Sequence, residues 1–428
     1  MTGRLARILR ALAVDADLLR RRRELRLLVF GQSTSLLGSM ITLVAIPVQV
    51  YDLTGSTVAV GLLGVAEFVP ILALALVGGA LADAFDRRRL VMLAEAGAIV
   101  IVAALVLNAA LEDPHVWFLY VAAALIAAFS AIRRPPLDAM LPRLVEREEL
   151  KAASALNWGV ANVAQLAGPA LAGVLIAWLG FGATYAVDLA TFVVSLAALA
   201  AMRTPPPTER QPVGVKAIAE GLRYAASRQE LLGTYLIDIV AMFFAMPMAL
   251  FPALAESYGG GAVVGLLYAA PSAGAVLFLA VSGWTARVHH HGRAVVLAAC
   301  GWGVAIAAFG LAQSLPLALA CLAVAGGADA ISGVFRATIW NETIPDRLRG
   351  RLAGVEMISW SAGPLLGNAE AGFAAALVGV RASVVAGGAL CVVGCGALTA
   401  ALPRLWAYDS RHAADRILRG SGPDVARF

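Results

Sequence analysis

Long apolar stretches alternate with short polar segments along the whole chain. The hydrocarbon core of a bilayer is about 30 Å thick, and a helix needs about 20 apolar residues to cross it. A helix also satisfies its own backbone hydrogen bonds, which lipid cannot do. The pattern therefore predicts twelve membrane-spanning helices, at residues 27–50, 57–82, 90–111, 116–132, 153–179, 182–201, 231–254, 262–286, 294–312, 315–340, 352–378 and 383–402.

Composition supports a membrane protein, since 60% of the 428 residues are hydrophobic and 14% are charged. The four cysteines all fall inside predicted spans, without a metal-ligand spacing to histidine, so they are interpreted as small packing residues. The first 24 residues lack the apolar core and cleavage site of a signal peptide. The first span is then expected to be the insertion signal.

The distribution of charge predicts the orientation. Arginines gather in the segments that face one side, for example at residues 20–23, 87–89 and 347–351, whereas the opposite loops carry Asp52, Glu112, Asp113 and Glu256. Basic segments stay in the cytoplasm. Both termini are therefore expected to be cytoplasmic, and the net charge of +5 reflects topology rather than a nucleic-acid partner. Abundant Arg, Ala and Gly beside two lysines suggest a bacterial plasma membrane.

The chain also contains an internal repeat. The string VGLL at residues 60–63 recurs at 264–267, and Gly79 maps onto Gly283 with the same shift. Prolines at 205–207 open a charged segment between the two copies. The predicted organisation is a cytoplasmic segment (1–24), a six-helix half (25–202), a linker (203–230), a second six-helix half (231–403) and a cytoplasmic tail (404–428).

The loop after the second span carries Gly79, Asp83, Arg87 and Arg88. Their spacing resembles the signature loop of the major facilitator superfamily, although Ala84 and Asp86 depart from its pattern. The resemblance implies that Asp83 faces the N-terminal end of the span at 352–378 and that the arginines lock an inner gate. An ordinary basic inner loop is the alternative.

Gly168, Pro169 and Gly173 in the fifth span partly resemble the antiporter motif of drug exporters, and a packing kink is the alternative. The strings at residues 46–63, 185–192 and 250–270 resemble the drug:proton antiporter group, which holds macrolide efflux proteins and the enterobactin exporter. The resemblance implies an all-α membrane protein with twelve transmembrane helices in two pseudo-symmetric six-helix halves, working by alternating access, as a monomer.

Ionisable residues inside spans are costly and suggest function. Seven acids fall there: Glu67, Glu95, Asp188, Asp238, Asp329, Glu356 and Glu370. Arg336 is interpreted as the one embedded base. The resemblance places Asp238, Asp329 and Arg336 nearest the cargo, Glu67, Glu356 and Glu370 at its border, and Glu95 and Asp188 in peripheral spans. Asp329 and Arg336 share a helix face but, two turns apart, are expected not to pair directly. Static pairing with neighbouring spans is the alternative.

Phe243, Phe244 and Trp360 are candidate cargo contacts, or lipid and packing contacts. His289, His290 and His291 could suggest a metal, but a solvated loop is preferred, and no metal or cofactor is predicted. The chain has no phosphate-binding loop and no catalytic constellation. The leading hypothesis is export of amphipathic organic molecules, such as drugs, in exchange for protons. Alternatives are siderophore export, and a lysophospholipid flippase or transporter-like receptor; the partners are the cargo, protons and the bilayer.

Overall fold

A computed structural model describes residues 18–84, 86–203 and 223–412, and this part of the chain contains helices and turns but no strand. The long helices of the first half of the chain are α2 (Arg23–Thr54), α3 (Thr57–Ala84), α4 (Arg87–Ala109), α5 (Val116–Met140) and α6 (Leu150–Ala201). The helices of the second half are α8 (Gln229–Phe244), α9 (Phe251–Ser257), α10 (Val263–Ala280), α11 (His291–Leu311), α12 (Leu315–Thr343), α13 (Asp346–Val378), α14 (Val380–Ala401) and α15 (Pro403–Trp406), of which α9 and α15 are short.

These helices account for the twelve predicted spans. Ten stretches of the described chain are long and apolar enough to cross a membrane. One of them, α6, contains two spans, because Gly180 has a φ of 76° and turns the chain between them. The charged helix α13 occupies the predicted span at 352–378. The prediction of an all-α membrane protein is confirmed.

Two spans differ from their predicted form. Helix α5 continues through Pro135 and Pro136 to Met140, so Arg133 lies inside a helix rather than in a loop. The seventh span is not continuous, because α8 ends at Phe244 and the chain passes through a 3₁₀ turn, Met248–Leu250, before α9 begins. Pro247 lies in this break and has no backbone N–H to donate to a helix.

Side chains satisfy the backbone groups that this break leaves free. The indole Nε1 of Trp302 donates to the carbonyl of Ala245 at 3.1 Å. The backbone N–H of Ala249 donates to the side-chain oxygen of Asn368 at 3.1 Å. Unpaired backbone groups are costly in lipid, so these contacts explain how the helix can open there.

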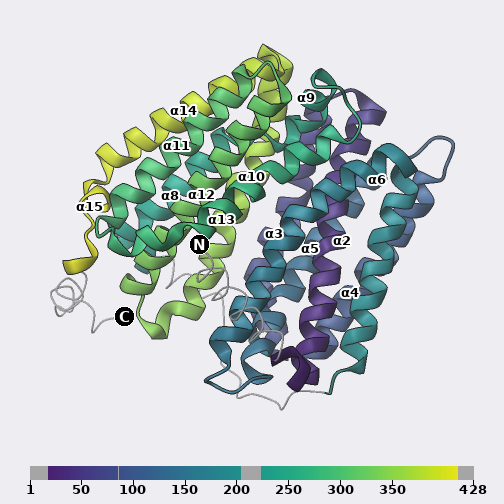
Figure 1. The fold of residues 1–428 in the computed structure, drawn as a ribbon, viewed down its shortest axis with the longest axis horizontal. Coiled ribbons are helices and arrows are strands. Elements are labelled where there is room, and N and C mark those ends of the chain that lie inside the picture. The colour runs from purple at the N-terminus through teal and green to yellow at the C-terminus, as the bar shows by residue number, and fades with distance from the viewer. Residues whose placement is uncertain (1–17, 85, 204–222, 413–428) are drawn as a thin grey trace, which may run out of the picture. The chain divides into compact units, whose positions relative to one another are not determined.

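The chain forms two compact units by packing. The first consists of residues 1–46 and 77–212, and the second of residues 47–76 and 213–428. In the second unit, α8 packs against α11, α12, α13 and α14 (Figure 1). The halves predicted at 25–202 and 231–403 are continuous in sequence. The two units are defined by contacts instead, and residues 47–76 of the first predicted half are part of the second unit.

Glycines bring α3 close to α13 within the second unit. A Cβ at Gly61 would lie 2.7 Å from the carbonyl oxygen of Asn368, and a Cβ at Gly64 would overlap the carbonyl of Leu365. The hydroxyl of Thr57 donates to the carbonyl of Gly372 at 3.1 Å. Small residues at such a crossing let two helix backbones approach closely in a membrane.

Candidate cargo and proton-binding sites

A charged triad lies in the second unit, formed by Asp238 on α8 and by Asp329 and Arg336 on α12. Arg336 Nη1 forms an ion pair with Asp238 Oδ1, and Arg336 Nη2 lies 3.6 Å from Asp329 Oδ1. The prediction that Asp329 and Arg336 cannot pair directly is therefore wrong. Helical side chains lean toward the N-terminus, so the long arginine reaches back along the axis toward Asp329.

The three members of the triad differ in exposure. The side chains of Asp238 and Arg336 are 7% and 11% exposed, whereas that of Asp329 is 44% exposed. Because Arg336 pairs with Asp238 on α8 and also contacts Asp329, the face of α12 that carries Asp329 and Arg336 is directed toward α8. Arg336 Nε is buried and has no hydrogen-bond partner within the described residues. The triad thus contains a buried ion pair between Asp238 and Arg336, the more accessible carboxylate of Asp329, and Arg336 Nε as a further hydrogen-bond donor.

Two aromatic side chains, which were not predicted, flank the triad. Tyr235 lies one turn before Asp238 on α8, and Trp340 one turn after Arg336 on α12. Their rings stack with centroids 5.2 Å apart, and Trp340 Nε1 donates to Thr234 Oγ1 at 2.8 Å. The spacing of three or four residues from each charged residue would have suggested this shared face.

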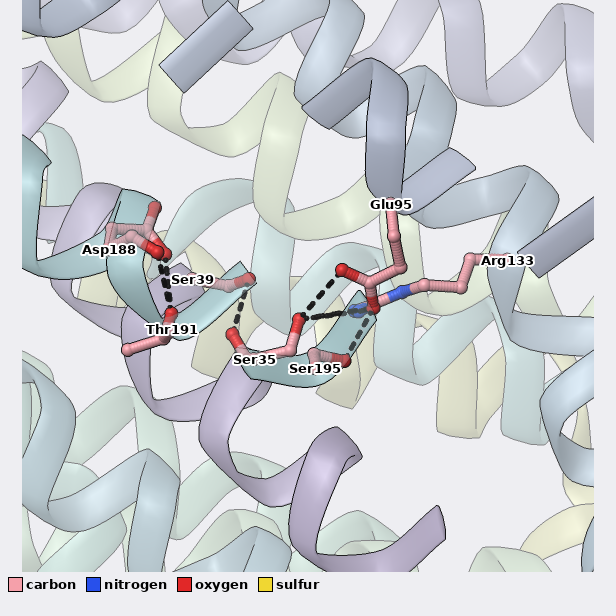
Figure 2. A network of polar contacts seen from close by, with 7 residues as sticks. All are labelled: Ser35, Ser39, Glu95, Arg133, Asp188, Thr191 and Ser195. Atoms are coloured by element: carbon pink, nitrogen blue, oxygen red, sulfur yellow. Dashed lines mark hydrogen bonds and ion pairs between the residues drawn. The ribbon is translucent and has the colours of Figure 1, made fainter. Parts of the chain in front are cut away.

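A second polar network is buried in the first unit (Figure 2). Glu95 on α4 is fully buried, and Arg133 Nη1 on α5 lies 2.6 Å from its Oε1. Arg133 Nη1 also donates to Ser35 Oγ at 2.7 Å, and Ser195 Oγ donates to Glu95 at 3.1 Å. The interpretation of Arg336 as the one embedded base is wrong, because Arg133 is 13% exposed and paired inside the bundle.

Asp188, on the second half of α6, lies in the same unit and is also fully buried. It accepts hydrogen bonds from the hydroxyls of Thr42, on α2, and Thr191. Gly38 makes room for it, since a Cβ there would overlap both Asp188 and Thr191. Glu95 and Asp188 were expected in peripheral spans; contacts with α2 and α5, which the sequence did not predict, place them in polar surroundings.

The other predicted cargo contacts lie on α3, α8 and α13. Glu67, on α3, interacts electrostatically with Tyr268. Phe243 and Phe244 form a perpendicular ring pair, 5.1 Å between centroids, at the end of α8. Glu356 and Glu370 are partly buried on α13, and Trp360 is 41% exposed.

The predicted inner-gate motif spans the end of α3 and the start of α4. Gly79 and Asp83 lie in α3, and the placement of their side chains falls outside what the structure describes. Arg87 begins α4, and Arg88 donates to the carbonyls of Leu199 and Ala200, at 2.9 and 2.7 Å. A cation there compensates the negative end of a helix.

The predicted antiporter motif is packed against α2. Gly168, Pro169 and Gly173 are all buried on α6. A Cβ at Gly168 would overlap Cβ of Met40, so this glycine sets the approach of the two helices.

The histidine loop holds the segment that follows α15. The N–H of Ser410 donates to the carbonyl of His289, and His290 Nδ1 lies 3.4 Å from Asp409 Oδ2. Hydrogen bonds from Arg411 hold the pKa of Asp409 well below its usual range. Within the described residues, no group of three or more His, Cys, Asp or Glu could hold a metal ion.

This arrangement of spans and embedded charges agrees with comparison to known proteins. A family model described as transmembrane secretion effector matches residues 20–419. The chain belongs to this family of the major facilitator superfamily. It is 30% identical to the enterobactin exporter EntS of Citrobacter koseri over 392 residues, which cover 89% of this chain and 92% of the relative. It is also 30% identical to EntS of Shigella boydii, over 86% of this chain and 87% of the relative.

Solved transporters share the fold. A bacterial homologue of the human lysosomal transporter Spinster, in an inward-facing and unoccupied conformation, superposes with a TM-score of 0.70 at 16% identity, covering 90% of this chain and 97% of that one. A POT family transporter in complex with 5-aminolevulinic acid does so with a TM-score of 0.70 at 11% identity, covering 90% and 97%. The family match and the 30% identical exporters show that the protein is a multi-pass transporter of the major facilitator type, not an enzyme.

Proposed function

We propose that this protein exports a small organic molecule of the siderophore class across the bacterial inner membrane, by alternating access and in a proton-coupled cycle. The observation that carries the proposal is the 30% identity to an enterobactin exporter over 92% of that relative's length. The leading hypothesis from the sequence, export of drugs in exchange for protons, becomes the second candidate.

The triad supplies a cargo site in this proposal. Arg336 pairs with Asp238 when no cargo is bound, and a proton on Asp238 releases the guanidinium for an acidic oxygen of the cargo. Asp329, whose side chain is 44% exposed, is the accessible carboxylate of the site. Trp340, which is partly buried and stacks on the buried Tyr235, offers its indole ring to an aromatic cargo.

One observation favours drug export. Two carboxylates accompany one guanidinium in the triad, so the site has a net negative charge when all three groups are ionised. Such a site prefers neutral or cationic amphipathic molecules, which compete with protons for Asp329. Cargo charge is therefore the property that separates the two candidates.

The remaining predicted residues have roles in the same cycle. The loop with Gly79, Asp83, Arg87 and Arg88 acts as the inner gate, and Gly168, Pro169 and Gly173 shape the fifth span. Further cargo contacts come from Glu67, Glu356, Glu370, Phe243, Phe244 and Trp360. The protein works as a monomer with both termini in the cytoplasm.

The test uses purified protein in liposomes that contain a pH-sensitive dye. Catecholate and hydroxamate siderophores and a panel of cationic drugs are added in turn, to the wild type and to Asp238→Asn, Asp329→Asn and Arg336→Gln. Asp113→Asn, in an exposed outer loop, is the matched control. Proton flux that depends on siderophores and is lost in Arg336→Gln supports the proposal. Flux driven by drugs alone favours the second candidate, and transport of neither rejects both and directs the test to lipid flipping.

A further inference from the structure

A stripe of small and hydroxyl side chains on α2 faces a matching stripe on the second half of α6. On α2 the stripe contains Gly31, Ser35, Gly38 and Thr42, and on α6 it contains Asp188, Thr191, Ser195 and Ala198. Figure 2 shows Asp188 and Thr191 near one end and Ser195, with Glu95 and Arg133, near the other. Seven residues separate Asp188 from Ser195, which corresponds to about 10 Å along a helix.

The two carboxyl groups of this network have different partners. Glu95 has a full ion pair with Arg133 and hydrogen bonds from Ser35 and Ser195. Asp188 is equally buried, but the hydrogen bonds to its carboxyl group come from the neutral hydroxyls of Thr42 and Thr191. A buried carboxyl group without a paired cation is most easily accommodated when it can carry a proton. Groups in contrasting surroundings take different roles, and here Glu95 is the ion-pair partner of Arg133.

The hydroxyls around Asp188 can serve both of its protonation states. Thr191 Oγ1 lies 2.7 Å from the backbone carbonyl of Asp188 and 3.2 Å from its Oδ1. A single hydroxyl hydrogen can therefore point to the carboxylate when Asp188 is ionised, or to the carbonyl when Asp188 carries its own proton. Thr42 makes the second contact and can equally accept a hydrogen bond from the protonated acid. No large rearrangement is needed to change state.

The charged and titratable groups that act on Asp188 come from three helices. Arg133, on α5, and Glu95, on α4, both interact electrostatically with Asp188. Tyr185, one turn earlier on α6, is buried and interacts electrostatically with the Asp188 carboxyl group. The ion pair of Glu95 and Arg133 has no net charge. It can therefore influence the electric field at Asp188 without imposing one charge state on the Asp188 carboxyl group.

We propose that Asp188 is a proton-binding site of the transport cycle, located in the first unit and separate from the Asp238–Arg336–Asp329 triad. Its carboxylate takes up a proton from water to form an O–H bond, and breaking that bond returns the proton to water. Arg133 and Glu95 are positioning residues that set the field at this site. The link between this proton and cargo movement rests on the proposed function, but proton binding itself does not.

The first experiment measures protonation without any cargo. Infrared difference spectra of the protein in lipid, recorded between pH 5 and pH 9, should contain a protonated-carboxyl band that disappears in Asp188→Asn and persists in Glu95→Gln. A carbodiimide, which attacks protonated carboxyl groups, should label the peptide with Asp188 in a pH-dependent way. A spectrum with no band assignable to Asp188, together with no label, overturns the proposal whatever the cargo is.

A milder variant guards against misfolding of Asp188→Asn. Thr42→Val has nearly the same shape and keeps the carboxyl group, so it should shift the pH midpoint of the band while the protein stays folded. An unshifted midpoint would show that Thr42 does not govern the site. In transport, Asp188→Asn should retain exchange of cargo for cargo and lose proton-driven accumulation by at least about tenfold. Unchanged accumulation would show that this proton is not the driving one, even if the cargo is correctly identified.

Discussion

The buried ion pair of Glu95 and Arg133 provides the most direct test of the structure. Glu95 is fully buried, and Arg133 is 13% exposed, so water screens their interaction little. Replacing Arg133 by Met removes the cation and leaves the carboxylate in the bundle with hydroxyl donors from Ser35 and Ser195. Breaking a buried pair by removing one partner costs about 3–5 kcal/mol, and the two hydroxyls place the expected loss near the lower value.

A loss of about 3 kcal/mol lowers the folded-to-unfolded ratio by roughly 150-fold. The double variant Glu95→Gln with Arg133→Met removes both charges and keeps similar volumes. Replacement of a whole buried pair is often close to neutral, so the double variant should unfold within about 1 kcal/mol of the wild type. Glu95→Gln alone completes a double-mutant cycle, and the coupling energy of the pair is the effect of the double variant minus the effects of the two single variants.

Equilibrium unfolding in mixed micelles, with increasing SDS and tryptophan fluorescence as the signal, measures these free energies. The exposed pair of Arg134 and Asp138, 4.0 Å apart on the same helix, provides the control, and Arg134→Met should change the free energy by less than about 1 kcal/mol. If Arg133→Met unfolds like the wild type, or if the double variant is as unstable as the single one, Arg133 and Glu95 do not form the buried pair described above.

Three further changes test other contacts. Gly64→Ala should separate α3 from α13, because its Cβ would overlap the carbonyl of Leu365, and should lower cross-linking between cysteines placed on the two helices, whereas Gly159→Ala, with open space around it, should not. Arg381→Gln removes the donors that reach the carbonyl of Ala312 and the hydroxyl of Ser257, and should destabilise the protein by about 1–3 kcal/mol in the same SDS titration. Asp409→Asn should speed hydrogen exchange of residues 403–412. Because the pKa of Asp409 is lowered in the fold, its contact is present at neutral pH and is lost only as pH falls through that lowered value. The protection factors of the wild type, which correct for the pH dependence of intrinsic exchange, should therefore not change through Asp409 between pH 8 and pH 6.

The comparison of sequence with structure separates two kinds of information. The twelve spans follow from length and hydropathy because each helix satisfies its own backbone in lipid and needs no knowledge of its neighbours. The repeat and the signature loop at Gly79 to Arg88 can also be recognised in the sequence without knowledge of tertiary contacts. They predicted the superfamily that the family model confirmed. Local errors arose where a helix continues past its apolar stretch, as at Arg133, or opens around a proline, as at Pro247.

Which buried charges act together could not be derived in the same way. Asp188 and Glu95 are 93 positions apart in the sequence, and no periodicity connects them, because their common neighbour is the hydroxyl face of α2. The reach of Arg336 to Asp329 likewise depends on side-chain direction, not on spacing alone.

The amino-acid sequence by itself thus determined the twelve spans, since lipid imposes its constraint on every segment separately. The resemblance of the loop at Gly79 to Arg88 predicted the major facilitator superfamily. The tertiary structure decided that Arg133 pairs with Glu95 and that Arg336 contacts two aspartates. It also decided that the Asp188 carboxyl group accepts its hydrogen bonds from neutral hydroxyls. Pairing among buried charges depends on which helix faces meet, and that is set by packing between segments far apart in the chain.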